Sequence, residues 1–190
     1  MTARPIVLVS LAPTTLPARA LLVVAGSLLI ALAAQVAVPL PFSPVPVTGQ
    51  TFAVLLIGAA FGARLGAATV ALYLAEGILG LPVFAPGGAV GPARLLGPTG
   101  GYLIGFVAAA YVVGALAERG WDRRLVTAAL AMLAGEVAIY AFGLAGLARF
   151  LPPDQLLAAG LLPFIPGDLV KLALAALALP TAWRLIGRRR

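Results

Sequence analysis

The sequence contains no cysteine and no histidine among its 190 residues. Without cysteine the chain has neither a disulfide nor a thiolate metal ligand, and the redox compartment stays undetermined. Without histidine it lacks the usual general base, the imidazole metal ligand and the serine–histidine arrangement of hydrolases. Because few carboxylates are left to act as acid or base, we do not expect an enzyme.

Charged residues are also scarce. They make up 10% of the chain, whereas 62% of it is hydrophobic. A soluble domain is usually about half apolar and a quarter charged, so this composition predicts an integral membrane protein. The net charge of +7 does not indicate nucleic-acid binding, because the arginines fall at the ends of apolar segments and not on one soluble face. No polar linker separates these segments, which predicts one transmembrane domain over residues 1–190.

A nucleotide-binding motif is missing as well. Lys171 is the single lysine, and no phosphate-binding loop precedes it, which excludes a Walker A sequence. The glycine-rich stretches at 87–91 and 97–101 follow no predicted strand, so a dinucleotide site is not indicated. The chain therefore has no visible means of using ATP by itself.

Long apolar segments dominate what is present. A membrane-spanning helix needs roughly 20 apolar residues, and fewer if it is tilted or sheltered by neighbours. We therefore expect an all-α bundle of six transmembrane helices. Their expected bounds are about 20–38, 48–63, 65–79, 99–117, 125–147 and 166–186. Between them, the proline-rich stretch 39–47 and the Gly- and Pro-rich stretch 82–98 are expected to be loops on one side of the membrane.

The basic residues orient this bundle. Six spans place both chain ends on one side, and most arginines fall on that side. They are Arg4, Arg19, Arg64, Arg119, Arg123, Arg124, Arg184, Arg188, Arg189 and Arg190. The other side carries Arg94 and Arg149, with Lys171 just inside it. By the positive-inside rule, both termini are cytoplasmic, and the two loops and the start of the last helix face outward.

The last apolar segment opens with the sequence FIPGDLVK at 164–171. Pro166 suits a first helical turn, which places Asp168 near the positive end of the helix dipole. Lys171 follows three residues later, so both side chains project from one helix face. Charged groups at the mouth of a membrane helix are costly and tend to be functional. The two residues form either a structural ion pair or a ligand site with one acceptor and one cation.

Other polar residues are candidates for the same site. Arg94 is the only charge in its loop, and is either a solvated arginine or a partner for an anionic ligand group. Glu136 lies near the middle of the fifth segment and shares its face with Tyr140. A carboxylate at that depth is either a site residue or a helix-packing residue. Thr48 and Gln50 begin the second segment, where they either bind a ligand or cap the helix.

Three stretches, in order, resemble the BioY family of biotin-specific substrate-binding (S) components of energy-coupling factor (ECF) transporters. FIPGDLVK is similar to the family's helix-six signature. PVPVTGQTFAVLL at 44–56 resembles a second motif, and GLPVFAPGG at 80–88, continuing to GPTGGYLIGF at 97–106, resembles a third. None is specific alone, but three ordered motifs at matching spacing are.

The resemblance implies a cell-membrane protein that binds biotin from outside. It also implies delivery inward with a transmembrane T subunit and two cytoplasmic ATPase subunits. Biotin suits the candidate residues, because Asp168 can accept a ureido N–H and Thr48 or Gln50 can bind the same group. Either Lys171 or Arg94 can offset the biotin carboxylate, and the sequence does not decide between them. No cofactor or metal is expected, and the remaining partner is the lipid bilayer.

The resemblance further implies that an alanine-rich face of the first helix docks on the T subunit. Ala33 and Ala37 are four apart and would share one face of a helix that extends to residue 38, allowing close helix approach. The same face can instead pack inside the bundle. The alternative function is a secondary transporter or channel for another small anionic or zwitterionic solute, with Asp168 and Lys171 as its coupling pair.

Overall fold

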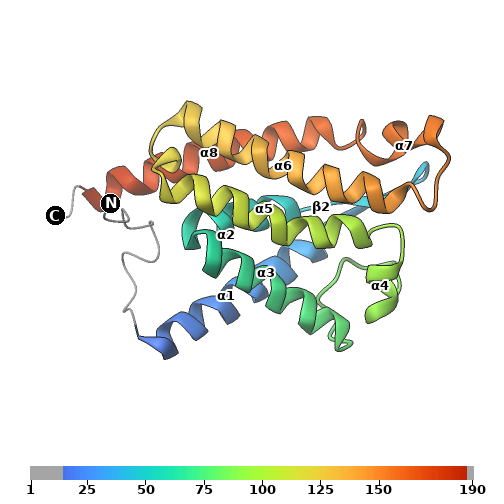
Figure 1. The fold of residues 1–190 in the computed structure, drawn as a ribbon, viewed down its shortest axis with the longest axis horizontal. Helices are drawn as coiled ribbons and strands as arrows, with labels where there is room; N and C mark the ends of the chain where they lie inside the picture. Colours follow the sequence, from blue (N-terminus) through green and yellow to red (C-terminus); the bar gives the residue numbers. More distant parts are fainter. Residues whose placement is uncertain (1–14, 188–190) are drawn as a thin grey trace.

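The computed structural model describes residues 15–187, which form a bundle of helices with a small hairpin at one end (Figure 1). The elements are α1 (Leu16–Gln35), β1 (Ala37–Leu40), β2 (Ser43–Thr48), α2 (Gln50–Phe61), α3 (Ala63–Ile78), α4 (Pro92–Leu96), α5 (Gly100–Glu118), the 3-10 helix η1 (Trp121–Arg123), α6 (Leu125–Leu147), α7 (Pro153–Gly160) and α8 (Ile165–Gly187).

The predicted helices are all present, with bounds that differ by a few residues. α6 has the predicted bounds, and Asp168 lies in the first turn of α8 as expected. By length and composition, α1, α5, α6 and α8 can cross a membrane, which confirms four of the predicted spans. α2 and α3 have 12 and 16 residues. A helix of α2's length extends only about 18 Å, against a hydrocarbon core of about 30 Å.

The prediction of an all-α chain is wrong at residues 37–48. The expected loop at 39–47 is an antiparallel hairpin, in which Ala37 pairs with Thr48, Val38 with Val47 and Leu40 with Ser43. Prolines are tolerated here because each strand of a two-stranded sheet has an open edge that needs no N–H donor. The first helix consequently ends at Gln35 and not at residue 38.

This earlier helix end also corrects the geometry behind the docking prediction. Ala37 belongs to β1, so it does not share a helix face with Ala33. Ala33 is partly buried against the core, and its carbonyl oxygen lies against Gly49. The exposed face of α1 carries mainly large apolar side chains, including Leu28 and Leu32.

Two stretches expected to be irregular contain short helices. α4 lies within the 82–98 loop and follows Gly91, whose φ of 66° is readily adopted by glycine. α7 lies between α6 and α8. Each begins with proline, which is favourable at the first helical position because no N–H is needed there.

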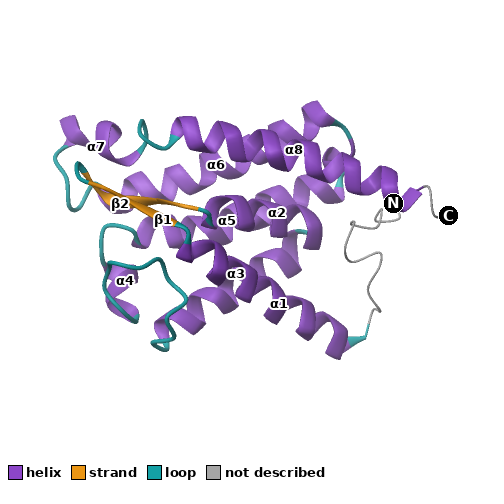
Figure 2. Cartoon of the chain, turned by 180° about the vertical axis from the view of Figure 1, so that it is seen from behind, coloured by secondary structure: helices purple, strands orange, loops and turns teal. Residues whose placement is uncertain are grey.

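The hairpin, α4 and α7 gather at one end of the bundle (Figures 1 and 2). Ser43 of β2 donates to the carbonyl oxygen of Ala159 in α7 at 2.7 Å, and Tyr102 of α5 donates to that of Gly160 at 2.7 Å. These bonds hold the hairpin and α7 over the ends of the longer helices. The two stretches 39–47 and 82–98 and the start of α8, which were expected on one side, all contribute to one cavity at this end.

The opposite end carries the start of α1, η1 and the end of α8. There the backbone N–H of Ala63 donates to Glu118 at 2.9 Å, and Trp183 donates to the buried carboxylate of Asp122 at 2.5 Å. The arginines predicted for this end are found here as far as they are described. These are Arg19, Arg64, Arg119, Arg123, Arg124 and Arg184. Arg4 and Arg188–Arg190 lie outside the described residues.

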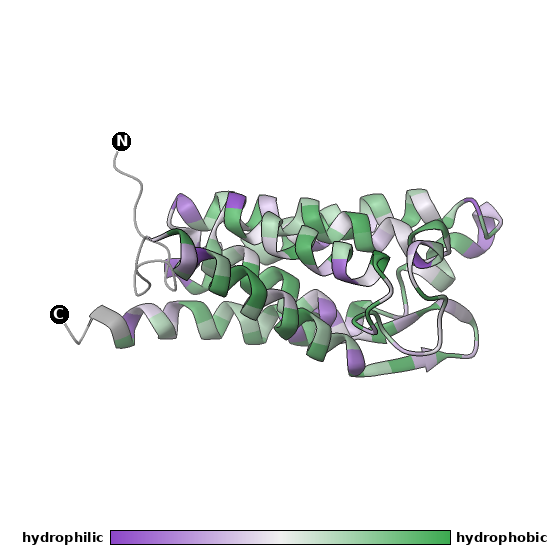
Figure 3. Ribbon diagram, turned by 90° about the horizontal axis from the view of Figure 1, so that it is seen from below, coloured by the Kyte–Doolittle hydropathy of each residue, from purple (hydrophilic) through white to green (hydrophobic). Residues whose placement is uncertain are grey.

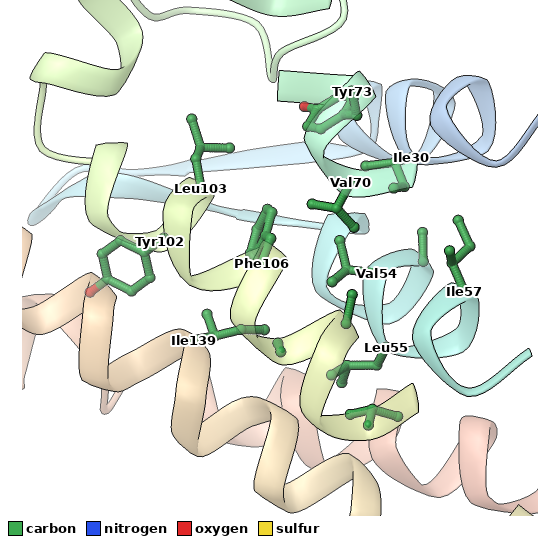
Figure 4. Packing of buried hydrophobic residues seen from close by; sticks show 14 of the residues in the cluster. Ile30, Val54, Leu55, Ile57, Val70, Tyr73, Tyr102, Leu103, Phe106 and Ile139 are labelled. Atoms are coloured by element: carbon green, nitrogen blue, oxygen red, sulfur yellow. The ribbon is translucent and has the colours of Figure 1, made fainter. Parts of the chain in front are cut away.

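Small residues let the central helices approach closely. A side chain added to Gly58 of α2 would meet the backbone of Ala110 in α5 at 2.7 Å, and one added to Gly66 of α3 would meet Gly58 at 3.0 Å. Around these contacts, buried apolar side chains of α2, α3 and α5 interdigitate (Figure 4).

Large apolar side chains also cover much of the outer surface. The helices are apolar along their middle, and polar residues collect near the two ends of the bundle (Figure 3). Leu32 is 69% exposed and Val137 is 61% exposed. Extensive exposed apolar surface is incompatible with water and fits a lipid environment.

Candidate ligand site

A cavity lies at the end of the bundle that carries the hairpin, α4 and α7. Its open volume is about 60 Å³. Apolar walls come from residues of several elements, including Val45, Phe84, Phe106, Ile139 and Phe164. A mostly apolar wall with a few placed polar groups is the usual composition of a small-molecule site.

The polar groups of this cavity are largely those that the sequence predicted. All the candidate ligand-binding residues except Glu136 line it. They are Thr48, Gln50, Arg94, Tyr140, Asp168 and Lys171. They come from the hairpin, α2, α4, α6 and α8, so the fold brings together residues that lie far apart in the sequence.

Asp168 is the centre of one polar cluster. Its carboxylate accepts hydrogen bonds from the Tyr140 hydroxyl and from Lys171 Nζ, the latter at 3.1 Å. Lys171 also donates to the Thr51 hydroxyl at 2.9 Å. The charges are mostly removed from solvent, with side-chain exposures of 10% for Asp168 and 16% for Lys171. This cluster joins α2, α6 and α8 and presents both acceptor and donor atoms to the cavity.

Gln50 is the centre of a second cluster, and it is oriented by its neighbours on both sides. Its side-chain carbonyl accepts from the Thr48 hydroxyl at 3.0 Å, and its amide nitrogen donates to Tyr73 at 2.6 Å. The Tyr73 hydroxyl in turn donates to the carbonyl oxygen of Val83 at 3.1 Å. The chain of bonds ties α2 to α3 and to the segment before α4, so the Gln50 amide has a defined position in the cavity wall.

Arg94 is not a solvated loop residue. It is 7% exposed, and its Nη2 donates to the carbonyl oxygen of Ala85 at 3.0 Å. Within residues 15–187 its guanidinium makes no ion pair, because the single ion pair there joins Lys171 to Asp168. Burial lowers the pKa of Arg94 from its ordinary value, yet arginine stays protonated in proteins. A buried cation without a counter-ion, lining a cavity, favours an anionic ligand group.

Glu136 is the exception among the predicted site residues. It lies one helical turn from Tyr140 but does not line the cavity. It is 5% exposed, and neither carboxylate oxygen has a hydrogen-bond partner among the described residues. Its side chain therefore belongs to the buried helix packing outside the cavity wall.

Most of the cavity wall was not predicted, and Thr51 and Phe84 are two examples. Thr51 adjoins Gln50 in the same motif and accepts a hydrogen bond from Lys171. Its hydroxyl, adjacent to a candidate residue at the start of a helix, is a signal that could have been used. Phe84 lines the cavity and packs edge-on against Tyr73 with ring centroids 5.5 Å apart. An apolar residue in a loop gives no comparable signal.

Comparison with known proteins agrees with this architecture. Residues 8–188 match the sequence profile of the BioY family. The chain belongs to the BioY family. A protein of Pyrococcus horikoshii named "probable biotin transporter BioY" is 42% identical over 144 residues, which cover 76% of this chain and 83% of the relative. The "biotin transporter BioY" of Rhodobacter capsulatus is 40% identical over 171 residues, covering 82% and 87% respectively.

A solved structure shares the fold of this BioY-family chain. It is the crystal structure of an S-component for biotin from an ECF-type ABC transporter, and it superimposes with a TM-score of 0.76 at 24% sequence identity. The match covers 90% of this chain and 95% of the other. The chain thus has the S-component fold.

The contact between Asp168 and Lys171 predicts a non-additive effect on stability. Replacing either residue alone, as in Asp168→Leu or Lys171→Met, leaves the other charge unpaired in a largely apolar site. Removing one member of a fully buried pair costs about 3–5 kcal/mol, and the partial exposure of Lys171 reduces this cost. The double replacement should recover most of the loss. Thermal unfolding in detergent compares the stability of the unaltered protein, the two single variants and the double variant. Additive losses of stability would show that the two charges do not interact.

Proposed function

We propose that this chain binds biotin in the cavity and serves as the substrate-binding S component of an ECF transporter in the cell membrane. The observation that carries the proposal is the cavity itself. It combines apolar walls, a cluster of donors and acceptors around Asp168, and a buried cation, Arg94, at a separate point of the wall. Relatives about 40% identical are named as biotin transporters, which supports the same ligand here.

Biotin matches these groups in number and kind. Its ureido ring has two N–H donors and one carbonyl acceptor, its bicycle and chain are apolar, and it ends in a carboxylate. Asp168 accepts a ureido N–H, and the Lys171 ammonium, which has three donors, has capacity for the ureido carbonyl. Because Lys171 is already paired with Asp168, Arg94 is the better partner for the carboxylate. The ring then lies near α8 and the chain points toward α4.

This orientation predicts different roles for the two charged regions. Asp168→Asn and Lys171→Ala should each weaken biotin binding roughly a hundredfold or more, because the remaining charge is left unpaired. Arg94→Gln should weaken binding about tenfold to a hundredfold through loss of a charge-assisted hydrogen bond. It should also abolish the preference for biotin over its uncharged methyl ester, whereas Asp168→Asn should keep that preference.

Isothermal titration calorimetry of purified protein measures these affinities. Arg149→Gln is the matched control, because Arg149 is exposed at the same end and should not affect binding. Near-normal biotin binding by both Asp168→Asn and Lys171→Ala would show that α8 does not contribute to the site. An unchanged preference for the acid over the ester in Arg94→Gln would reverse the proposed orientation.

We also propose that six helices form the membrane domain, over residues 1–190, with both termini cytoplasmic and the cavity end facing outward. The arginine-rich end would then lie in the cytoplasm, in accordance with the positive-inside rule. α2 and α3 are short and follow one another through Gly62, so they would extend into the bilayer within the shelter of their neighbours.

The absence of cysteine allows a clean test of this topology. Cysteines introduced singly at Ala89 or Ala93, both exposed in the loop around α4, should react with an impermeant thiol reagent added to intact cells. A cysteine in place of Arg119, exposed at the other end, should react only after permeabilisation. The reverse pattern would invert the topology.

Transport against a gradient needs a partner, because the sequence has no nucleotide-binding motif. We assign this role to a T subunit with two ATPase subunits, docked on the exposed face of α1. Ala25, which is exposed beside Leu28 and Leu29, and the partly buried Ala33 are small residues on this helix. Their size would allow a partner helix to approach closely.

Ala25→Trp should therefore disrupt co-purification with the T subunit and ATP-dependent uptake, while biotin binding is kept. Ala33→Trp should have the same effect if its exposed edge joins the interface. Leu130→Trp, on the exposed surface of α6, is the control and should change none of these properties. If these α1 variants lose biotin binding together with docking, the replaced alanines pack inside the bundle. If docking is unchanged, the interface with the T subunit lies on another helix.

A further inference from the structure

A second cavity lies beside the first, between the hairpin and the segment that precedes α4. Its volume is about 380 Å³, compared with about 60 Å³ for the first. Its walls are Ala37, Pro39, Leu40, Ser43, Pro44, Pro46, Pro86, Gly87, Gly88 and Arg94. Arg94 and Pro46 line both cavities, so the two spaces meet at these side chains.

The two terminal nitrogens of the Arg94 guanidinium lie against residues of different cavities. Nη2 donates to the carbonyl oxygen of Ala85, a residue that lines the first cavity. Nη1 lies against Gly88, which lines the second cavity, and any side chain at Gly88 would overlap it. Among residues 15–187, Arg94 is also the only charged residue in the wall of the second cavity. The Arg94 guanidinium can therefore donate to a ligand acceptor in either cavity.

We propose that the second cavity accepts ligand atoms beyond the carboxyl carbon of biotin, so that the protein also binds biotin joined through an amide to an amino acid. The proposal rests on the proposed function and its orientation, in which the chain of biotin ends at Arg94. The amide carbonyl would replace a carboxylate oxygen on one side of the guanidinium. The carboxylate of the amino acid would then reach the other side, and exposed wall residues such as Pro86 and Gly87 leave the far end open to solvent.

Three ligands test whether the protein binds the added amino acid and whether it recognises the carboxylate of that amino acid. They are free biotin, biotinyl-glycine and the N-isobutyl amide of biotin, which has nearly the shape of biotinyl-glycine but no carboxylate. We expect biotinyl-glycine to bind within about tenfold of biotin, and the isobutyl amide at least about tenfold more weakly than biotinyl-glycine, as for a lost charge-assisted hydrogen bond.

Two variants test whether the added amino acid occupies the second cavity. Ala37→Trp fills the second cavity from the hairpin side, whereas Val38→Trp is the matched control. Val38 is the next residue on the same strand and points to the opposite face, where it is 58% exposed. In Ala37→Trp, biotinyl-glycine should bind at least about tenfold more weakly, while biotin stays within about threefold of its original affinity. Val38→Trp should change neither affinity.

Equilibrium titrations with biotin and biotinyl-glycine on the same preparations separate the outcomes, because biotin binding also reports on folding. Binding of biotin but not of biotinyl-glycine by the unaltered protein overturns the proposal and leaves the proposed function intact. Equal effects of Ala37→Trp on both ligands, or no effect on either, also overturn it. Failure of the unaltered protein to bind biotin at all would instead overturn the proposed function.

Discussion

A polar side chain inside an apolar helix bundle is costly unless it has a hydrogen-bond partner, and the cluster around Asp168 meets this constraint. Unsatisfied polar groups are expensive in a low-dielectric interior, and more so in a membrane. Here Tyr140, Asp168, Lys171 and Thr51 satisfy one another across three helices. A ligand that enters therefore meets groups whose positions are already set by their partners.

Arg94 departs from this mutual satisfaction. Its charge is buried, yet the only hydrogen bond of its guanidinium in residues 15–187 goes to the backbone carbonyl of Ala85. A buried charge without a counter-ion is costly, and this cost is the physical basis of the proposed preference for ligands that carry a carboxylate. Arg94 lines both cavities, so in the proposed binding mode it lies between the cavity that holds the ring and the cavity that accepts a longer ligand.

The fold is retained over considerable sequence change. The crystal structure of an S-component for biotin has 24% identity with this chain and a TM-score of 0.76. Close backbone contacts restrict substitution at a few positions of this chain. Gly101 and Gly105 of α5 lie against the backbone of α6, where only small residues fit, while apolar side chains elsewhere can exchange for one another.

The sequence by itself determined the positions of the long helices, because apolar runs bounded by proline, glycine and charge identify a membrane helix without reference to its neighbours. For the same reason the start of α8, with Asp168 in its first turn and Lys171 three residues later, was predictable. The local pattern did not reveal the hairpin, because a strand of alternating proline and valine is stable only when another strand pairs with it.

The tertiary structure alone decided which polar residues share a space. Glu136 and Tyr140 lie on one face of α6, yet only Tyr140 lines the cavity. Ala33 and Ala37 have helical spacing, yet the chain leaves the helix between them. Helices that are apolar on every side carry no amphipathic pattern to show which face is buried. That choice depends on contacts between helices distant in sequence, and so does the placement of Arg94 between the two cavities.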